Sequence, residues 1–189
     1  QHRQYILTEA SPIARIGKKP IKMMLDVGRE STGVFRLFEG DVFAGGVSQP
    51  PDIGIFLYSL TNNFITSQTV ANAFDNPVDL RVIAQKIATD NGLQLDYNAS
   101  PKNIENYSFT GAPNKQIQKL NEMGNIIAFV DNGTLVVLDA DQPRGDTIRE
   151  INAQTGMVGV PQPTTEGCSV IVMLDNTIVV GCRVRVKSD

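Results

Sequence analysis

The sequence predicts an α+β protein, mostly β, in which small antiparallel barrel-like segments flank a two-helix α+β insert. Short apolar runs separated by Gly and Pro turns fill 21–75, which is typical of small sheets. The apolar period lengthens to three and four residues twice within 76–140, and alternation returns in 141–189. We therefore expect an amino-terminal arm over 1–20, a first barrel part over 21–75, the insert over 76–140 and a second barrel part over 141–189.

Composition limits the classes of function. The 189 residues are 41% hydrophobic and 20% charged, which is an ordinary globular composition. No apolar run approaches the roughly 20 residues of a membrane-spanning helix, so we expect no membrane insertion and no secretory signal. The net charge of -3 argues against specific nucleic-acid binding. The single histidine, His2, leaves little room for histidine-dependent catalysis or zinc sites.

The first barrel part is expected to contain four strands, at 21–27, 34–38, 42–47 and 53–60. A turn is expected at 39–41. Two adjacent glycines inside a strand pattern indicate a bulge or a close backbone approach, here at Gly45 and Gly46. A rigid break, in which neither proline has an N–H for a strand ladder, is formed by Gln49, Pro50, Pro51 and Asp52.

The insert is expected to begin with a helix over 77–91. Asn76 is the expected N-cap, Pro77 the first helical residue, and Gly92 a left-handed terminator. Apolar side chains recur with helical spacing, at Leu80, Ile83, Ala84, Ile87 and Ala88.

The rest of the insert is expected to be strand, strand, helix, strand, strand. The strands lie at 93–97 and 107–110, and a second helix opens at Pro113 and closes at Gly124. The segments 126–130 and 134–138 form a hairpin, because Asp131-Asn132-Gly133 is a strong turn signal. Both helices are expected to cover one face of the sheet.

The second barrel part is expected to fold back at Asp175 and Asn176, which would turn 170–174 into 178–186. Cys168 and Cys182 flank this hairpin, and without a secretory signal we expect two buried thiols; a disulfide between them stays open.

A possible basic stripe alternates with apolar residues near the carboxyl end, at Arg183, Arg185 and Lys187. This alternation fits a solvated strand face above a buried one, and it also fits a stripe that faces an acidic partner or a phosphate backbone. Both interpretations stay open.

No motif with catalytic or cofactor chemistry is present. The glycines at 40–46 match neither a Walker loop nor a dinucleotide fingerprint, and 131–133 lacks the spaced acids of a calcium loop. The GXXG at 156–159 lacks flanking basic residues. We therefore predict no catalytic residue, no cofactor and no metal site, and a protein that is not an enzyme.

Several segments, taken in their order along the chain, resemble one protein family. They are Tyr5-Ile-Leu-Thr-Glu-Ala-Ser-Pro12, Leu25-Asp-Val-Gly28, Leu37-Phe-Glu-Gly-Asp-Val42, Ser48-Gln-Pro-Pro-Asp-Ile53 and Thr155-Gly-Met-Val-Gly-Val-Pro161. The family is that of the baseplate hub proteins of contractile phage tails, related to the T4 hub and to Mu-like D proteins. A helix-bearing insert between two β segments also resembles these hubs. Family members usually carry more β structure before the position of Tyr5.

The resemblance implies a structural protein of the virion tail baseplate, assembled in the bacterial host cytoplasm. It implies a homotrimeric ring that joins the tail tube to the central spike and lets DNA and the tape measure pass. The tape measure and the baseplate wedge proteins are further expected partners. That copies must associate into a closed ring also follows from the residues, because partial barrels leave open strand edges that need a partner. We expect 49–52 to lie near a subunit boundary.

Two other classes of function remain open. One is a hub or spike component of a type VI secretion apparatus, which shares the architecture. The other is a small ligand-binding or peptidoglycan-binding module built on 76–140, which would need an aromatic-lined groove. That segment contains few aromatic residues: Tyr97, Tyr107, Phe109 and Phe129.

Overall fold

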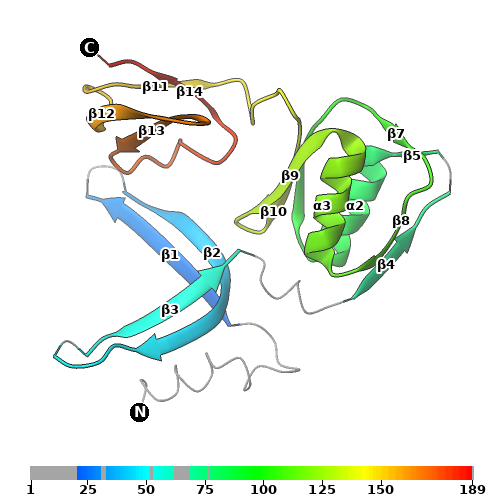
Figure 1. Ribbon diagram of the computed structural model, residues 1–189, viewed down its shortest axis with the longest axis horizontal. Coiled ribbons are helices and arrows are strands. Elements are labelled where there is room, and N and C mark those ends of the chain that lie inside the picture. Colours follow the sequence, from blue (N-terminus) through cyan, green and yellow to red (C-terminus); the bar gives the residue numbers. More distant parts are fainter. Residues whose placement is uncertain (1–20, 31–32, 52, 62–68, 76, 189) are drawn as a thin grey trace. The chain divides into compact units, whose positions relative to one another are not determined.

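A computed structural model describes residues 21–30, 33–51, 53–61, 69–75 and 77–188. Within them the chain divides into two compact units, which we describe separately (Figure 1). Unit 1 comprises the residues up to 27 together with 36–140, and unit 2 comprises 28–35 together with 141–189. The expected arm over 1–20, and Asp52 and Asn76, lie outside the described residues. The structure is mostly β with two described helices, which confirms the predicted fold class.

The amino-terminal β segment is a three-stranded sheet in the order β1-β2-β3. Its strands are β1 (Lys22–Arg29), β2 (Gly33–Val47) and β3 (Ile55–Leu60). β2 and β3 are antiparallel, with Cα partners running from Asp41 and Leu60 to Val47 and Ile55. Within the described residues this sheet does not close into a barrel, so β1 and β3 are its two edges.

β2 differs from the prediction because it runs without interruption through the expected turn at 39–41. Asp41 is 1% exposed and its carboxylate lies 3.2 Å from Nζ of Lys22. A Cβ at Gly40 would lie 2.8 Å from the carbonyl oxygen of Leu60, so the glycine allows close packing inside a strand. The predicted turn at 39–41 is therefore wrong.

The register of β2 shifts between Val42 and Ala44, so the irregularity lies just before the predicted glycine pair. Gly46 has a packing role instead. A Cβ at this position would lie 2.3 Å from Cζ of Phe56, its Cα partner on β3. The absence of a side chain at Gly46 is what allows the Phe56 ring to lie across the strand.

The insert is built on a second sheet, in the order β6-β10-β9. The strands are β6 (Gln94–Asn98), β9 (Ile126–Asp131) and β10 (Thr134–Asp139). β9 and β10 form the predicted hairpin, with Asn132 and Gly133 at φ 43° and 78° in the turn. β6 and β10 are parallel. The chain between them passes through a helix, and such a crossover returns the strand in the same direction.

Helix α2 (Leu80–Asp90) begins later than predicted. Its N-cap is Asp79, whose Oδ1 accepts a hydrogen bond from the Arg81 N–H at 2.7 Å. Val78 and Asp79 are held extended as β5 (Val78–Asp79), which pairs with β7 (Asn103–Ile104). This pairing keeps the backbone out of the helix until Leu80, so the prediction of a helix from Pro77 is wrong.

The other predicted helix boundaries are confirmed. Gly92 follows the C-cap of α2 with φ +64°. Helix α3 (Pro113–Gly124) has Pro113 in its first turn and ends at Gly124. Asn125 follows in the left-handed conformation, which a small polar side chain tolerates. A two-stranded ribbon of β4 (Val70–Ala73) and β8 (Ser108–Gly111) completes this part of unit 1.

The core of unit 1 lies between the two helices and the β6-β10-β9 sheet. α2 contacts β6 and β10, and α3 contacts β9 (Figure 1). All five apolar residues predicted for the inner face of α2 are fully buried. They pack in one cluster with buried side chains from the other elements, including Tyr107, Ile117, Leu120, Leu135 and Val137.

Unit 2 contains two small sheets. β11 (Ile148–Ile151) and β14 (Arg183–Val186) are parallel, and β12 (Met157–Thr164) and β13 (Gly167–Val172) form an antiparallel ribbon. The predicted hairpin at Asp175 and Asn176 is therefore wrong, since β13 pairs with β12 and β14 pairs with β11. Asp175 instead makes a local turn, because its Oδ1 accepts hydrogen bonds from both N and Oγ1 of Thr177.

Candidate functional site

Strand β3 is the most apolar exposed element of unit 1. Its large side chains are between 36% and 55% exposed although they are aliphatic or aromatic: Ile55, Phe56, Leu57, Tyr58 and Leu60. Side chains alternate across a strand, so these residues place apolar surface on both faces of the sheet. A three-stranded sheet by itself covers neither of its two faces.

One face of this sheet carries an aromatic cluster. The Tyr58 ring lies 5.5 Å from Phe56 in an edge-on arrangement and 6.0 Å from Phe43. Such contacts order the rings without removing them from solvent. The cluster, together with the aliphatic residues of β3, forms an apolar surface at an edge of the sheet.

The edge position of β3 adds a second property. Edge strands usually carry charges or prolines that prevent another strand from pairing with them. No charged residue occurs from Ile53 to Phe74, a stretch that contains β3. We did not predict this surface from the sequence, although the uncharged stretch is the signal that would have indicated it. The strand therefore has neither a covering element among the described residues nor a charge that would keep a partner away.

The predicted boundary segment 49–52 lies in the connection from β2 to β3. This connection is closed at its base, where Ser48 N–H donates to the Gly54 carbonyl at 3.0 Å and Gly54 N–H donates to Ser48 Oγ at 2.6 Å. Gln49, Pro50 and Pro51 are exposed, and the bond between the two prolines is cis. Three of these four residues thus lie in the connection that leads to the exposed strand β3.

Unit 2 has an apolar surface of its own on the β12–β13 ribbon. Val158 and Ile171 are Cα partners and are 50% and 68% exposed. Val160 and Met173 are also exposed. The tip of the ribbon, in contrast, is polar from Gln162 to Ser169, apart from Pro163, Gly167 and Cys168.

The predicted basic stripe lies on β14. Arg183, Arg185 and Lys187 are exposed, and Lys187 Nζ lies 2.8 Å from Oε2 of Glu150. This hydrogen bond is the main cause of a lowered pKa for Glu150, and the charge of Arg185 adds to it. Val184, between the arginines, is 44% exposed, so this strand is not a solvated face above a fully buried one.

The cysteines differ from the prediction. Both thiols are free, Cys168 is exposed, and Cys182 is only partly buried. Cys168 lies on β13 opposite Pro163, near the polar tip of the ribbon, whereas Cys182 immediately precedes β14. The expectation of two buried thiols fails because the two residues do not belong to one hairpin.

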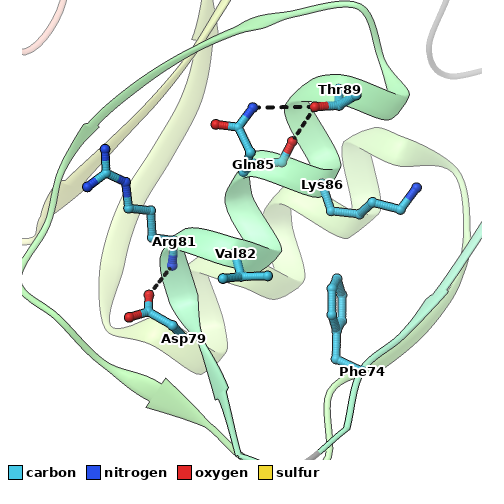
Figure 2. Close-up of a pocket in the computed structure, with 7 residues that line it drawn as sticks. All are labelled: Phe74, Asp79, Arg81, Val82, Gln85, Lys86 and Thr89. Atoms are coloured by element: carbon cyan, nitrogen blue, oxygen red, sulfur yellow. Dashed lines mark hydrogen bonds between the residues drawn. The ribbon is translucent and has the colours of Figure 1, made fainter.

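A groove of about 530 Å³ lies along α2, a volume within the usual range for ligand sites. Figure 2 shows Phe74 facing the outer side of the helix, where Val82 is 52% exposed. The remaining lining residues are polar: Asp79, Arg81, Gln85, Lys86 and Thr89.

Most polar groups of the groove bind one another. Asp79 caps the helix, and Gln85 Nε2 donates to Thr89 Oγ1 at 3.3 Å (Figure 2). Lys86 forms an ion pair with Asp90. The Arg81 guanidinium lies over the Tyr97 ring, 5.7 Å from its centroid. A small-molecule site usually directs a few polar groups toward its ligand, and these groups are directed toward their neighbours. The groove therefore gives little support to a ligand-binding module.

The strongest electrostatic cluster stabilises the insert. Lys102 Nζ donates to Asp139 Oδ1 at 2.7 Å and to the carbonyl of Gly124 at 3.1 Å, at the end of α3. Ser100 donates to Asp139 Oδ2 through both N–H and Oγ, at 2.8 and 2.6 Å. The hydrogen bond from Lys102, and then those from Ser100, lower the pKa of Asp139 to about 2. Lys102 thus links the Asp139 carboxylate of β10 to the end of α3.

A metal centre and a membrane-spanning helix are two further kinds of functional feature. Within them, no three or more His, Cys, Asp or Glu side chains lie together in a way that would hold a metal ion. No described helix is long and apolar enough to cross a membrane. The exposed apolar strands and the basic stripe are therefore the surfaces on which a functional interpretation can be built.

Comparisons with known proteins bear on this interpretation. A solved structure, the 43 kDa tail protein of prophage MuSo2 from Shewanella oneidensis, is similar to this chain, with 15% sequence identity and a TM-score of 0.47. The similarity covers 89% of this chain and 58% of that one, so the chain spans less than two thirds of that protein's length. No curated protein sequence matches the chain. The protein family described as "Baseplate hub gp41" matches residues 1–189. The chain therefore belongs to the baseplate hub gp41 family.

Proposed function

We propose that the protein is a structural, non-enzymatic component of a phage tail baseplate hub, where copies of the chain assemble into a ring. The family match over residues 1–189 is the observation that carries the hub role. It supports a place in the virion baseplate and contacts with other tail proteins. The exposed strand surfaces support the assembly itself.

The ring is argued from the open sheet of unit 1. β3 is uncharged and apolar on both faces, while the opposite edge, β1, has three charged side chains, two of which are paired inside the sheet. Lys22 pairs with Asp41, and Asp26 pairs with Arg36. Because these two charges are neutralised internally, this part of β1 can accept an uncharged strand at little electrostatic cost.

Pairing β3 of one copy with β1 of the next is a head-to-tail contact, which closes into a ring when its rotation permits. In this arrangement 49–52 lies at the boundary between copies, because it leads directly into β3. The threefold number is what the resemblance to contractile-tail hubs implies. The same resemblance implies that the ring connects the tail tube to the central spike.

DNA and the tape measure would pass through such a ring during ejection. The net charge of -3 supports this role, because DNA binds proteins largely through basic side chains that neutralise its phosphates. A ring whose subunits are slightly acidic would retain the passing DNA weakly.

The oligomeric state tests the proposal. Size-exclusion chromatography with light scattering should give about three times the 20.6 kDa chain mass at high concentration. Negative-stain images of the same sample should show rings.

A pair of variants tests the surface. Leu57→Lys on β3 should shift the chain toward monomer, because the lysine would have to be desolvated in the contact. Val82→Lys, which adds the same charge to exposed apolar surface on α2, should leave the assembly unchanged. Circular dichroism of both variants checks that they are folded. A chain that stays monomeric at all concentrations, including with the tail tube protein present, would contradict the ring.

A further inference from the structure

The basic stripe of unit 2 carries more positive charge than the described part of the chain neutralises. Of its three cations, Lys187 is paired with Glu150, which is also the Cα partner of Arg185 on β11 and lies within reach of its charge. Neither Arg183 nor Arg185 makes an ion pair or a side-chain hydrogen bond with a described residue, and both are exposed. Arg183 has Ile148, a neutral side chain, as its Cα partner on β11. Three cations on one strand face thus share the single carboxylate of Glu150, and Arg183 faces no acid on β11.

The strand that carries these arginines also has a free edge. Among the described residues β11 and β14 form a two-stranded sheet, so β14 has a described strand partner on one side only. Lys187 N–H donates to the Ile151 carbonyl at 2.9 Å. Because backbone groups of a strand point alternately to its two sides, the N–H and C=O groups of Val184 and Val186 point away from β11. These groups are the donors and acceptors that an added strand would use.

We propose that β14 binds an extended acidic segment of a partner protein, which adds to the sheet as a strand beside Val184. Residues two apart on a strand lie about 6.5 Å apart on one face. An added strand has the same period, so acidic side chains at every second position would face Arg183 and Arg185. The exposed Val184 side chain, on the other face, would be covered by the intervening residues of the partner.

The same charges could in principle attract a nucleic acid, but two observations favour a protein strand. The free backbone edge can hydrogen-bond to a peptide in register, and a phosphate backbone offers no N–H groups to pair with its carbonyls. The cations are also flanked by apolar surface, since Ile148 and Val184 are 42% and 44% exposed. A partner that alternates acidic and apolar side chains fits both features. This inference does not depend on the ring, because it concerns a different unit of the chain.

Peptide binding to the full 189-residue chain tests the inference. The probe is a fluorescent peptide with glutamate at every second position and threonine or valine between, measured by fluorescence anisotropy. One control peptide has the same composition with its glutamates in one block. Another has the alternating sequence with N-methylated backbone amides, which cannot pair with a strand edge. An oligothymidine of the same charge represents a phosphate backbone.

The expected result is saturable binding of the alternating peptide alone. Arg185→Glu should weaken it about three- to tenfold, as expected for reversing one cross-strand charge pair. Lys115→Glu, an equal charge change at an exposed position on α3, should leave the affinity unchanged. Arg183→Glu provides a second variant if the new acid at 185 repels Glu150 and disturbs the sheet.

Other outcomes would overturn the inference. Absence of saturable binding would show that the edge takes no such strand. Equal binding of the block or N-methylated peptide would show that charge alone acts. Tighter binding of oligothymidine through the same arginines would assign the stripe to a phosphate backbone instead.

Discussion

Individual buried residues decide whether the insert folds. Ile83 is completely buried on the inner face of α2, whereas Val82, the preceding residue, is 52% exposed. The two positions share a helix and nearly the same side-chain size, and they differ in what surrounds them. They therefore separate the effect of burial from the effect of helix propensity.

Ile83→Asp should lower the free energy of unfolding by about 3–5 kcal/mol, because it places an unpaired charge in the core. Val82→Asp should change it by less than about 1 kcal/mol, since the carboxylate stays hydrated. Urea unfolding monitored by circular dichroism measures both. Equal losses for the two variants would mean that the buried face of α2 has been assigned incorrectly.

Asp139 makes the stability of the insert dependent on pH. Its pKa is about 2 in the folded chain, below the ordinary value of 3.8, because Lys102 and Ser100 hydrogen-bond to the carboxylate. A carboxyl group with a lowered folded pKa stabilises the fold fully above its unfolded pKa. This stabilisation is lost as the pH falls from about 4 through about 2.

Asp139→Asn should therefore be less stable than the natural chain at pH 6, and the difference should shrink as the pH approaches 2. Thermal unfolding at a series of pH values measures it. Glu122→Gln, at an exposed position on α3, serves as the control and should show no such trend. A difference between Asp139→Asn and the natural chain that stays constant down to pH 2 would disprove the role of the carboxylate.

At the scale of elements, the two predicted hairpin turns differ in outcome: one joins the strands as predicted and the other does not. The Asn132-Gly133 turn joins β9 to β10 as predicted, because both residues adopt positive φ and only one register fits such a tight connection. The Asp175-Asn176 pair has a similar composition but closes only a local turn onto Thr177. A turn signal therefore predicts a change of direction and does not identify the strand that pairs afterwards.

Gly133→Ala should destabilise the chain by about 1–2 kcal/mol, because φ +78° places a Cβ against the following backbone. Gly54→Ala is the matched control in another connection, where φ is outside the left-handed region and the new Cβ would meet only Ser48 Oγ at 3.4 Å. It should change stability by less than about 0.5 kcal/mol. Chemical denaturation of the two variants compares them. If the order of the two effects were reversed, the hairpin turn would have been described incorrectly.

At the scale of the whole molecule, buried and exposed apolar surface are unevenly distributed. The insert has a continuous core, whereas β3 and the β12–β13 ribbon expose large aliphatic side chains. Local stability follows the density of buried contacts, so these parts should open at different free energies.

Amide hydrogen exchange should show this difference. Amides of α2 and β10 should exchange slowly at every protein concentration. Amides of β3 should exchange quickly in dilute solution and more slowly as copies associate, since pairing would cover the strand. Protection of β3 that does not depend on concentration, under conditions where light scattering shows association, would exclude β3 from the contact.

The sequence by itself determined the properties that depend on neighbouring residues. The mostly β composition, the inner face of α2, the Pro113 start of α3 and the Asn132-Gly133 hairpin all follow from local spacing or local backbone preference. The resemblance to baseplate hubs likewise rested on the order of short segments, and the family match over 1–189 confirms it.

The tertiary structure decided what depends on partners distant in the chain. Pairing with β7 holds the residues of β5 in an extended conformation, so α2 begins only at Leu80. β14 pairs with β11, so the predicted second hairpin does not form. The exposure of β3 and of the two cysteines also depends on partners distant in the chain. Alternation shows that a strand has two faces, but only the placement of the other elements determines whether either face is covered.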